Sequence, residues 1–394
     1  PAVDYAESGQ AVSHSLSTTI STFGTLLARQ SGEEFRPWFD TFMPEQAIPQ
    51  PGQLFRNPAL AKTLAEIGET QAESFYRGAL AQNIADFSAK HGGFITEDDL
   101  ASYEPEWVDP VSVSYRGYDV WEIPPNGQGI VALMALNILK GFEPAGRDDV
   151  LGLHRELEAI KLAFADGHAF ISDAKHMRTP LSVLLSDAYG EERRRGIGDR
   201  AAMPMPGKPN GSGTVYLCAA DGEGNMISYI QSNYRGFGSG LVVPGTGIAL
   251  QNRGLGFSLD PASDNCVAPR KRPYHTIIPG FLTKDGQAVG PFGVMGGYMQ
   301  PQGHVQVVRN LVDRGMNPQA CLDAPRWQWI EGKRVELEYG YAEHLLEGLK
   351  ARGHEMSFEA NRNSFGRGQM ILQTGKETLM GGTDPRCEGE CAAW

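Results

Sequence analysis

The sequence GSGTVYLCAADGEGNMIS, residues 211–228, contains two short apolar runs on either side of a turn. The runs TVYLCAA and NMISYIQ flank DGEG, and this pattern predicts a β-hairpin. The first run begins at Thr214 directly after PGKPNGSG, a stretch rich in glycine and proline that predicts an exposed loop. Such a junction is either an ordinary strand start or a new chain terminus produced by cleavage.

Composition narrows the class of protein. The 394 residues are 41% apolar and 21% charged, which is typical of a globular chain with a sizeable core. The longest apolar stretch, GIVALMALNIL at 129–139, is too short to span a bilayer, so we expect no membrane partner. A net charge of -12 disfavours nucleic-acid binding. Because the chain begins with Pro1, we expect it to be processed or partial, and the sequence indicates no compartment.

The first half is predicted to be mostly helical. Apolar residues recur at three- and four-residue spacing in segments 59–93 and 151–170, while 111–125 favours two short strands around a turn. After Pro204 strands alternate with glycine-rich turns, at 214–220, 225–232, 241–250, 276–283 and 288–295. A helix at 301–315, strands at 334–339 and 369–374, and a helix near 344–353 complete the pattern.

Metal, nucleotide and cysteine chemistry have weak sequence support. The nine histidines form no H-E-x-x-H motif, and GKPNGSGT and GFGSG lack the spacing of phosphate and dinucleotide loops, so we expect no metal and no cofactor. The five cysteines are odd in number and have no C-x-x-C spacing, which argues against a disulfide framework. One alternative nucleophile stays open, Cys218 with His275 or His304 as its base.

Cleavage before Thr214 would create its own catalyst. A threonine hydroxyl is a poor nucleophile until a base takes its proton, and a free α-amino group with a reference pKa of about 8 is such a base on the same residue. The hydroxyl can also make the cut by attacking the preceding carbonyl in a distorted peptide. Gly213 is the residue type that tolerates such distortion best.

From residue 55 onward, many segments occur in the order found in one family. The chain resembles the γ-glutamyltranspeptidase family of N-terminal nucleophile hydrolases. The segments are NPALAKTLAEIG at 57, FYRGALAQNI at 75, GGFITEDDLASY at 92, YRGYDVWEIPPNGQG at 115, HRELEAIKLAFAD at 154, TVYLCAADGEGNMIS at 214, FGSGLVVPGTGIALQN at 237, KRPYHTIIPGF at 271 and MGGYMQPQGHVQVVRNLVDRGMNP at 295.

The resemblance implies roles for particular residues. Thr214 takes the place of the nucleophile that self-cleavage at the Gly213–Thr214 bond exposes, and Ser232 matches the hydroxyl that bonds it. Gly296 and Gly297 match the pair whose backbone amides form an oxyanion hole.

The expected substrate-binding positions differ from the γ-glutamyl pattern. His275 and Thr276 replace a serine pair that holds the substrate's α-carboxylate, and Tyr234 replaces an asparagine. Arg253 and Gly256 stand where the family has Gln or Glu and then Asp to bind the substrate's ammonium group. An arginine in place of a carboxylate favours an acyl group that ends in a carboxylate, because its planar fork binds carboxylates bidentately.

The fold implied by the resemblance is α+β, a four-layer αββα sandwich. The resemblance also implies that one precursor is cut into two pieces, a large-subunit portion 1–213 and a small subunit 214–394. These two pieces form a heterodimer, and two such heterodimers can associate as a homodimer. A further large-subunit section with core strands, found in the family, is absent from this sequence.

Three functions remain open from the sequence. The first is a self-cleaving amidase or acyltransferase that moves a γ-glutamyl or related group from a small amide to water or an amine, as in glutathione metabolism. The second is a glutaryl-type acylase similar to the cephalosporin acylases. The third, from another class, is an uncleaved and inactive family member that acts as a binding protein.

Overall fold

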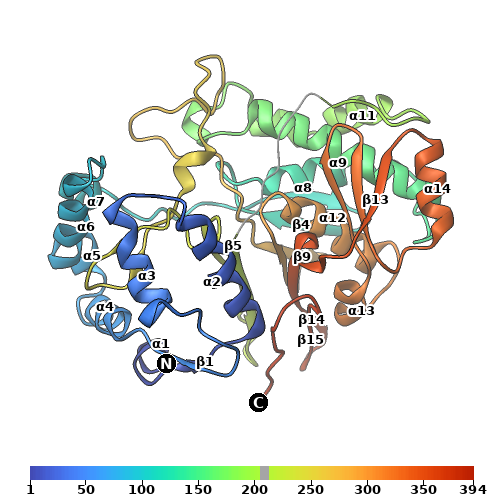
Figure 1. The fold of residues 1–394 in the computed structure, drawn as a ribbon. Coiled ribbons are helices and arrows are strands. Elements are labelled where there is room, and N and C mark those ends of the chain that lie inside the picture. The colour runs from blue at the N-terminus through green and yellow to red at the C-terminus, as the bar shows by residue number, and fades with distance from the viewer. Residues whose placement is uncertain (205–212) are drawn as a thin grey trace. The chain divides into compact units, whose positions relative to one another are not determined.

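The computed structural model describes residues 1–204 and 213–394, which form two compact units (Figure 1). Unit 1 comprises Pro1–Trp107 and Asn233–Asn252, and unit 2 comprises Val108–Ser232 and Arg253–Trp394. The loop predicted at 206–213 lies, apart from Gly213, outside the described residues. Division by compactness does not test the predicted division at the Gly213–Thr214 bond, because a cut in the chain need not fall at the edge of a compact unit.

Unit 1 is mainly helical, as predicted. An aromatic cluster forms part of its core, in which Trp38 is fully buried and its ring lies 5.3 Å from that of Phe237. Residues 233–252 therefore fold back onto the first hundred residues. The helices are α1 (Ala2–Ser8), α2 (His14–Leu27), α3 (Arg36–Phe42), α4 (Pro58–Glu69), α5 (Glu73–Arg77), α6 (Ala79–Lys90) and α7 (Glu97–Ala101). Its short strands are β1 (Gln10–Ala11), β2 (Leu54–Phe55), β7 (Val242–Val243) and β8 (Ile248–Ala249).

Two sequence predictions in unit 1 need correction. The helical segment 59–93 is three helices, because Gln71 and Ala72 take positive φ angles and Gly78 is not helical. The strand predicted at 241–250 is reduced to β7 and β8, two residues each, since the segment PGTG turns the chain between them.

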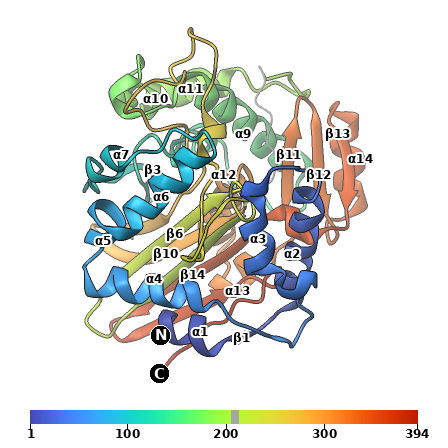
Figure 2. The ribbon, with the colours of Figure 1, turned by 60° about the vertical axis from the view of Figure 1, so that its left-hand side comes forward.

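Unit 2 is built around a six-stranded antiparallel sheet in the order β15-β14-β10-β9-β4-β3. A hairpin, β5–β6, forms a separate two-stranded sheet (Figure 2), and its strand β5 packs against β10 and β14 of the six-stranded sheet. A third sheet has the order β11-β12-β13. The strands are β3 (Val111–Tyr115), β4 (Tyr118–Glu122), β5 (Gly213–Ala220), β6 (Met226–Tyr234), β9 (Gly280–Lys284), β10 (Gln287–Met295), β11 (Trp327–Glu331), β12 (Arg334–Glu338), β13 (Glu355–Glu359), β14 (Arg367–Gly375) and β15 (Thr378–Thr383).

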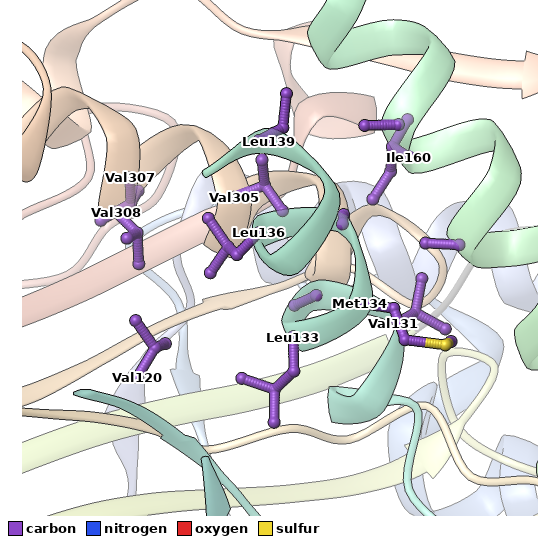
Figure 3. Packing of buried hydrophobic residues seen from close by; sticks show 14 of the residues in the cluster. Val120, Val131, Leu133, Met134, Leu136, Leu139, Ile160, Val305, Val307 and Val308 are labelled. Atoms are coloured by element: carbon purple, nitrogen blue, oxygen red, sulfur yellow. The ribbon is translucent and has the colours of Figure 1, made fainter. Parts of the chain in front are cut away.

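Helices α8 and α12 of unit 2 pack on strands of the six-stranded sheet, and α9 and α11 pack on α8. Helix α8 is buried along its whole length because it is apolar on all sides. Figure 3 shows its side chains between Val305 of α12 and Ile160 of α9, all part of one apolar core. The helices are α8 (Gly129–Leu139), α9 (Val150–Phe170), α10 (Leu181–Leu184), α11 (Asp187–Arg195), α12 (Met299–Val312), α13 (Pro318–Asp323) and α14 (Glu343–Ala351).

Unit 2 thus stacks helices, a large sheet and a small sheet, and the predicted α+β sandwich class is confirmed. The two strands predicted within 111–125, the strand at 288–295 and the helices at 151–170 and 301–315 are present within a few residues. The strand predicted at 276–283 begins only at Gly280. The residues before it, Thr276 to Pro279, are irregular. Within the described residues, no helix combines the length and apolar composition needed to cross a bilayer.

Candidate active site

The β5–β6 hairpin brings Thr214 and Ser232 together. The backbone N–H of Asp221 donates to the carbonyl of Asn225 and closes the turn, and Thr214 and Ser232 each stand seven residues from this pair. Equal spacing from the turn makes them cross-strand neighbours. Thr214 Oγ1 donates to Ser232 Oγ over 3.0 Å, and the Thr214 side chain is only 5% exposed.

Alternation along β5 sets which side chains face inward. Thr214 and Tyr216 are buried, whereas Val215 between them is 53% exposed. The Tyr216 ring lies against Gly293 of β10, where an added Cβ would come within 2.4 Å of the ring. Tyr216 Oη also lies 2.8 Å from Ser228 Oγ, which in turn donates to the carbonyl of Gly280. The strand that carries Thr214 is therefore fixed against the strand that leads to Gly296.

Gly296 and Gly297 form the turn between β10 and α12. Their φ angles are 141° and 59°, which L side chains rarely adopt. The amide of Met299 donates to the carbonyl of Gly296 and the amide of Gln300 to that of Gly297, both over 3.1 Å. These bonds fix the Gly296–Gly297 and Gly297–Tyr298 peptide groups at the start of a 14-residue helix, where backbone donors favour negative charge.

Arg253, His275 and Thr276 also come together in unit 2. Arg253 is 5% exposed, and its Nη1 donates to Thr276 Oγ1 over 2.7 Å. Burial, followed by the nearby Arg253 charge, lowers the pKa of His275 to about 3. The imidazole is therefore neutral at physiological pH, and the positive charge of this group belongs to the guanidinium.

Tyr234 belongs to unit 1, although β6 continues into it from unit 2. It is buried, adopts a φ of 78°, and lies 5.6 Å below the guanidinium of Arg235.

Gln128 was not assigned a role from the sequence. It precedes α8, is completely buried, and its Nε2 donates to the carbonyls of Thr276 and Gly297, each over 2.7 Å. One side chain thus links the loop of Thr276 to the glycine turn. The available sequence signal was a glutamine in a Gly-x-Gly segment directly before a helix without a polar face.

The alternative nucleophile Cys218 does not fit its surroundings. Burial raises the pKa of its thiol to about 12, so the reactive thiolate is scarce. His275 is a weak base for the reason given above. Both ring nitrogens of His304 are engaged, because Nδ1 lies 2.6 Å from Glu122 Oε1 and Nε2 accepts from the amide of Val294.

Among the described residues, His154, Glu158 and His354 place their ligand atoms within 4.8 Å of one another. Such a donor set suits zinc. The buried Lys161 ammonium, however, donates to Glu158 Oε1 over 2.7 Å, and the rings of His154 and His354 bond each other over 2.8 Å. Because a side-chain cation already balances the carboxylate, we assign no metal to this cluster.

Known proteins resemble this chain over its whole length. The sequence pattern described as gamma-glutamyltranspeptidase matches residues 1–394. A glutathione hydrolase-like YwrD proenzyme of Bacillus subtilis is 35% identical over 99% of this chain and 74% of its own length. An oxamate amidohydrolase proenzyme of Klebsiella pneumoniae is 33% identical over 100% of this chain and 75% of its own length.

A solved structure agrees with these sequence matches. The crystal structure of cephalosporin acylase from Bacillus halodurans superimposes with a TM-score of 0.96 and 53% sequence identity, covering 100% of this chain and 73% of that one. The family pattern matches every residue, and the structure has a threonine–serine pair on a hairpin and a glycine turn at a helix start. The chain therefore belongs to the γ-glutamyltranspeptidase family.

Proposed function

We propose that Thr214 is the nucleophile of this enzyme, and that it becomes one by cutting the chain before itself. The relatives are glutathione hydrolases, amidohydrolases and acylases, several of them named as proenzymes, and the chain is accordingly an amide-cleaving enzyme of this kind. The observation that carries the residue assignment is the 3.0 Å hydrogen bond between Thr214 and Ser232.

The proposed maturation is an acyl shift. Thr214 Oγ1 attacks the carbonyl carbon of Gly213, the peptide C–N bond breaks, and an ester joins Gly213 to the threonine oxygen. Water then hydrolyses this ester, which leaves a carboxylate on Gly213 and a free α-amine on Thr214. The products would be the two expected pieces, 1–213 and 214–394.

The proposed turnover uses the new amine as base. It takes the proton of Thr214 Oγ1 as the oxygen attacks the substrate carbonyl, while Ser232 keeps that oxygen in position. The amine leaving group departs with a proton and an acyl ester remains on Thr214. Water or another amine then removes the acyl group, giving a carboxylic acid or a new amide.

The amides of Gly296 and Gly297 are proposed to stabilise the oxyanion. The supporting observations are the positive φ angles of both residues and the hydrogen bond to the carbonyl of Gly296, which fixes the peptide group that carries the Gly297 N–H. Donors fixed before the reaction need no reorganisation when negative charge develops, which is worth several kcal/mol in related sites.

Arg253 and Thr276 are proposed to bind a carboxylate at the far end of the acyl group, with His275 as a neutral neighbour. The guanidinium is buried and bonded to Thr276. Arg253 and Gly256 occupy the positions where the family resemblance expects the groups that bind an ammonium, and this exchange suits a dicarboxylic acyl chain such as glutaryl better than γ-glutamyl. The cephalosporin acylase match favours this acylase alternative. Tyr234 is retained as a proposed substrate contact from the family resemblance alone.

Intact-mass measurement of the purified protein tests the proposal. We expect two pieces that meet between Gly213 and Thr214, and Thr214→Ala should give one uncut, inactive chain. Thr246→Ala, which removes another buried threonine hydroxyl, should be cut normally. An active Thr214→Ala protein would show that another nucleophile does the chemistry. A wild-type chain that is neither cut nor active would support the binding-protein alternative.

A further inference from the structure

We propose that Gln128 is a positioning residue for acyl transfer, which sets the spacing between the oxyanion-binding turn and the loop that binds the acyl carboxylate. The inference rests on the proposed function. Its basis is the pair of hydrogen bonds from Nε2 of Gln128 to the carbonyls of Thr276 and Gly297. Gln128 contacts no proposed reacting atom, so any effect on the reaction passes through these two backbone groups.

The two bonds restrict the geometry tightly. Both carbonyl oxygens lie 2.7 Å from the same nitrogen, so they can be no further apart than twice that distance, 5.4 Å. Each amide proton of the side chain has one acceptor, and the residue is 0% exposed. Because water has no access to the buried side chain, solvent cannot readily replace its hydrogen bonds.

Backbone bonds hold Gln128 in place. The amide of Gln128 donates to the carbonyl of His275 over 2.8 Å, and the amide of His275 donates to the carbonyl of Asn126 over 2.9 Å. The side chain of Asn126 adds a bond to the carbonyl of Pro273 over 2.7 Å. These three bonds join segment 126–128 to segment 273–275, and Oε1 of Gln128 accepts a further bond from Tyr274 Oη over 3.4 Å. The glutamine amide therefore has a fixed direction.

This link connects the two ends of a bound acyl group. Gly297 is proposed to contact the reacting carbonyl oxygen, and Thr276, bonded to Arg253, is proposed to contact the distal carboxylate. The distance between these contacts decides which acyl chain length reaches both at once. Loss of the link should lower kcat, because misplacement by about 1 Å costs up to about 100-fold in rate, and should weaken discrimination by chain length.

The test compares two buried glutamines with the same bonding. Gln128→Met keeps the length of the side chain and removes both donors. The control is Gln306→Met: Gln306 is 4% exposed, and its Nε2 donates to the carbonyls of Gln302 and Trp327 over 3.1 and 3.0 Å. Each variant loses these two donated hydrogen bonds and one accepted by Oε1, from Tyr274 Oη in the case of Gln128 and from the Trp327 amide in the case of Gln306. Only Gln128 bonds the proposed site.

Steady-state rates are measured on succinyl, glutaryl and adipyl anilides. Each rate is divided by the concentration of cleaved enzyme, which intact-mass measurement gives. For Gln128→Met we expect kcat on the preferred substrate to fall about 10- to 100-fold with little change in KM, and the preference among the three chains to narrow. Gln306→Met should lose similar thermal stability and keep kcat within about twofold. Gln128→Asn, whose shorter amide reaches one carbonyl at most, should give an intermediate kcat and serves if Gln128→Met does not fold.

Clear outcomes overturn the inference. If both Gln128 variants keep wild-type kcat and chain-length preference while Thr214→Ala is inactive, the proposed function stands and the positioning role of Gln128 is refuted. Equal losses of kcat in Gln128→Met and Gln306→Met would also refute it, because the effect would then be a general loss of stability. Activity in Thr214→Ala would instead refute the proposed function.

Discussion

Replacement of Arg253 by glutamine is the most direct test of which acyl group this enzyme accepts. Arg253 is 5% exposed, and its guanidinium donates to Thr276 Oγ1 over 2.7 Å. A hydrogen bond to a charged group contributes about 1.5 to 3 kcal/mol. Loss of the proposed bond between Arg253 and the distal carboxylate of the substrate therefore corresponds to a decrease of roughly 10- to 150-fold in kcat/KM. We expect this loss for a glutaryl anilide and almost none for a butyryl anilide, which has no distal carboxylate.

Arg253→Lys serves as the matched variant because it keeps the positive charge and loses the planar fork. It should fall between the wild type and Arg253→Gln on the glutaryl substrate. A γ-glutamyl anilide completes the series, since its ammonium group is repelled by the guanidinium. We therefore expect Arg253→Gln to reduce the difference in kcat/KM between the glutaryl and γ-glutamyl anilides.

The same variant has an independent spectroscopic signature. The Arg253 charge is the second cause, after burial, of the lowered pKa of His275. Removing a positive neighbour favours the imidazolium, so the pKa of His275 should rise from about 3 but stay below 6.5 because the ring is still buried. Titration followed by NMR measures it. If the pKa of His275 rises in Arg253→Gln while the substrate preference is unchanged, Arg253 lies beside His275 as described but does not bind the acyl carboxylate.

Two further predictions concern the nucleophile and acid stability. Ser232→Ala should slow chain cleavage and lower kcat about 10-fold without raising KM, because a bond to the reacting oxygen is lost; single-turnover and steady-state assays measure these changes. The control Ser228→Ala, on the same strand, should lower stability alone. Equal losses of kcat in the two variants would contradict the role of Ser232. Burial lowers the pKa of His168 to about 4 and of His354 to about 3. Below about pH 6.5 these two imidazoles bind protons in the unfolded chain but not in the folded chain. The stability of the fold should therefore be full above pH 6.5 and decrease toward pH 4. A melting temperature that stays constant over this range would refute the argument.

Local pattern predicted much of the fold. The hairpin at 214–232 could be recognised from two apolar runs and a DGEG turn, and the helix at 151–170 from its apolar spacing. Both depend on interactions between residues close in sequence. The segment 276–279 was mistaken for a strand because its composition favours one, whereas the carbonyl of its first residue, Thr276, accepts a hydrogen bond from Gln128, 148 residues earlier in the chain.

The residues available for chemistry can be read directly from the sequence: a threonine after glycine, a serine at the matching position across the turn, and a glycine pair before a helix. Three features follow only from the packed fold: Arg253 bonds Thr276, Cys218 lies where its thiol stays protonated, and Gln128 joins two loops. These features depend on residues far apart along the chain. Gln128 bonds residues 148 and 169 positions away, and no local periodicity records contacts that form only when the core has packed.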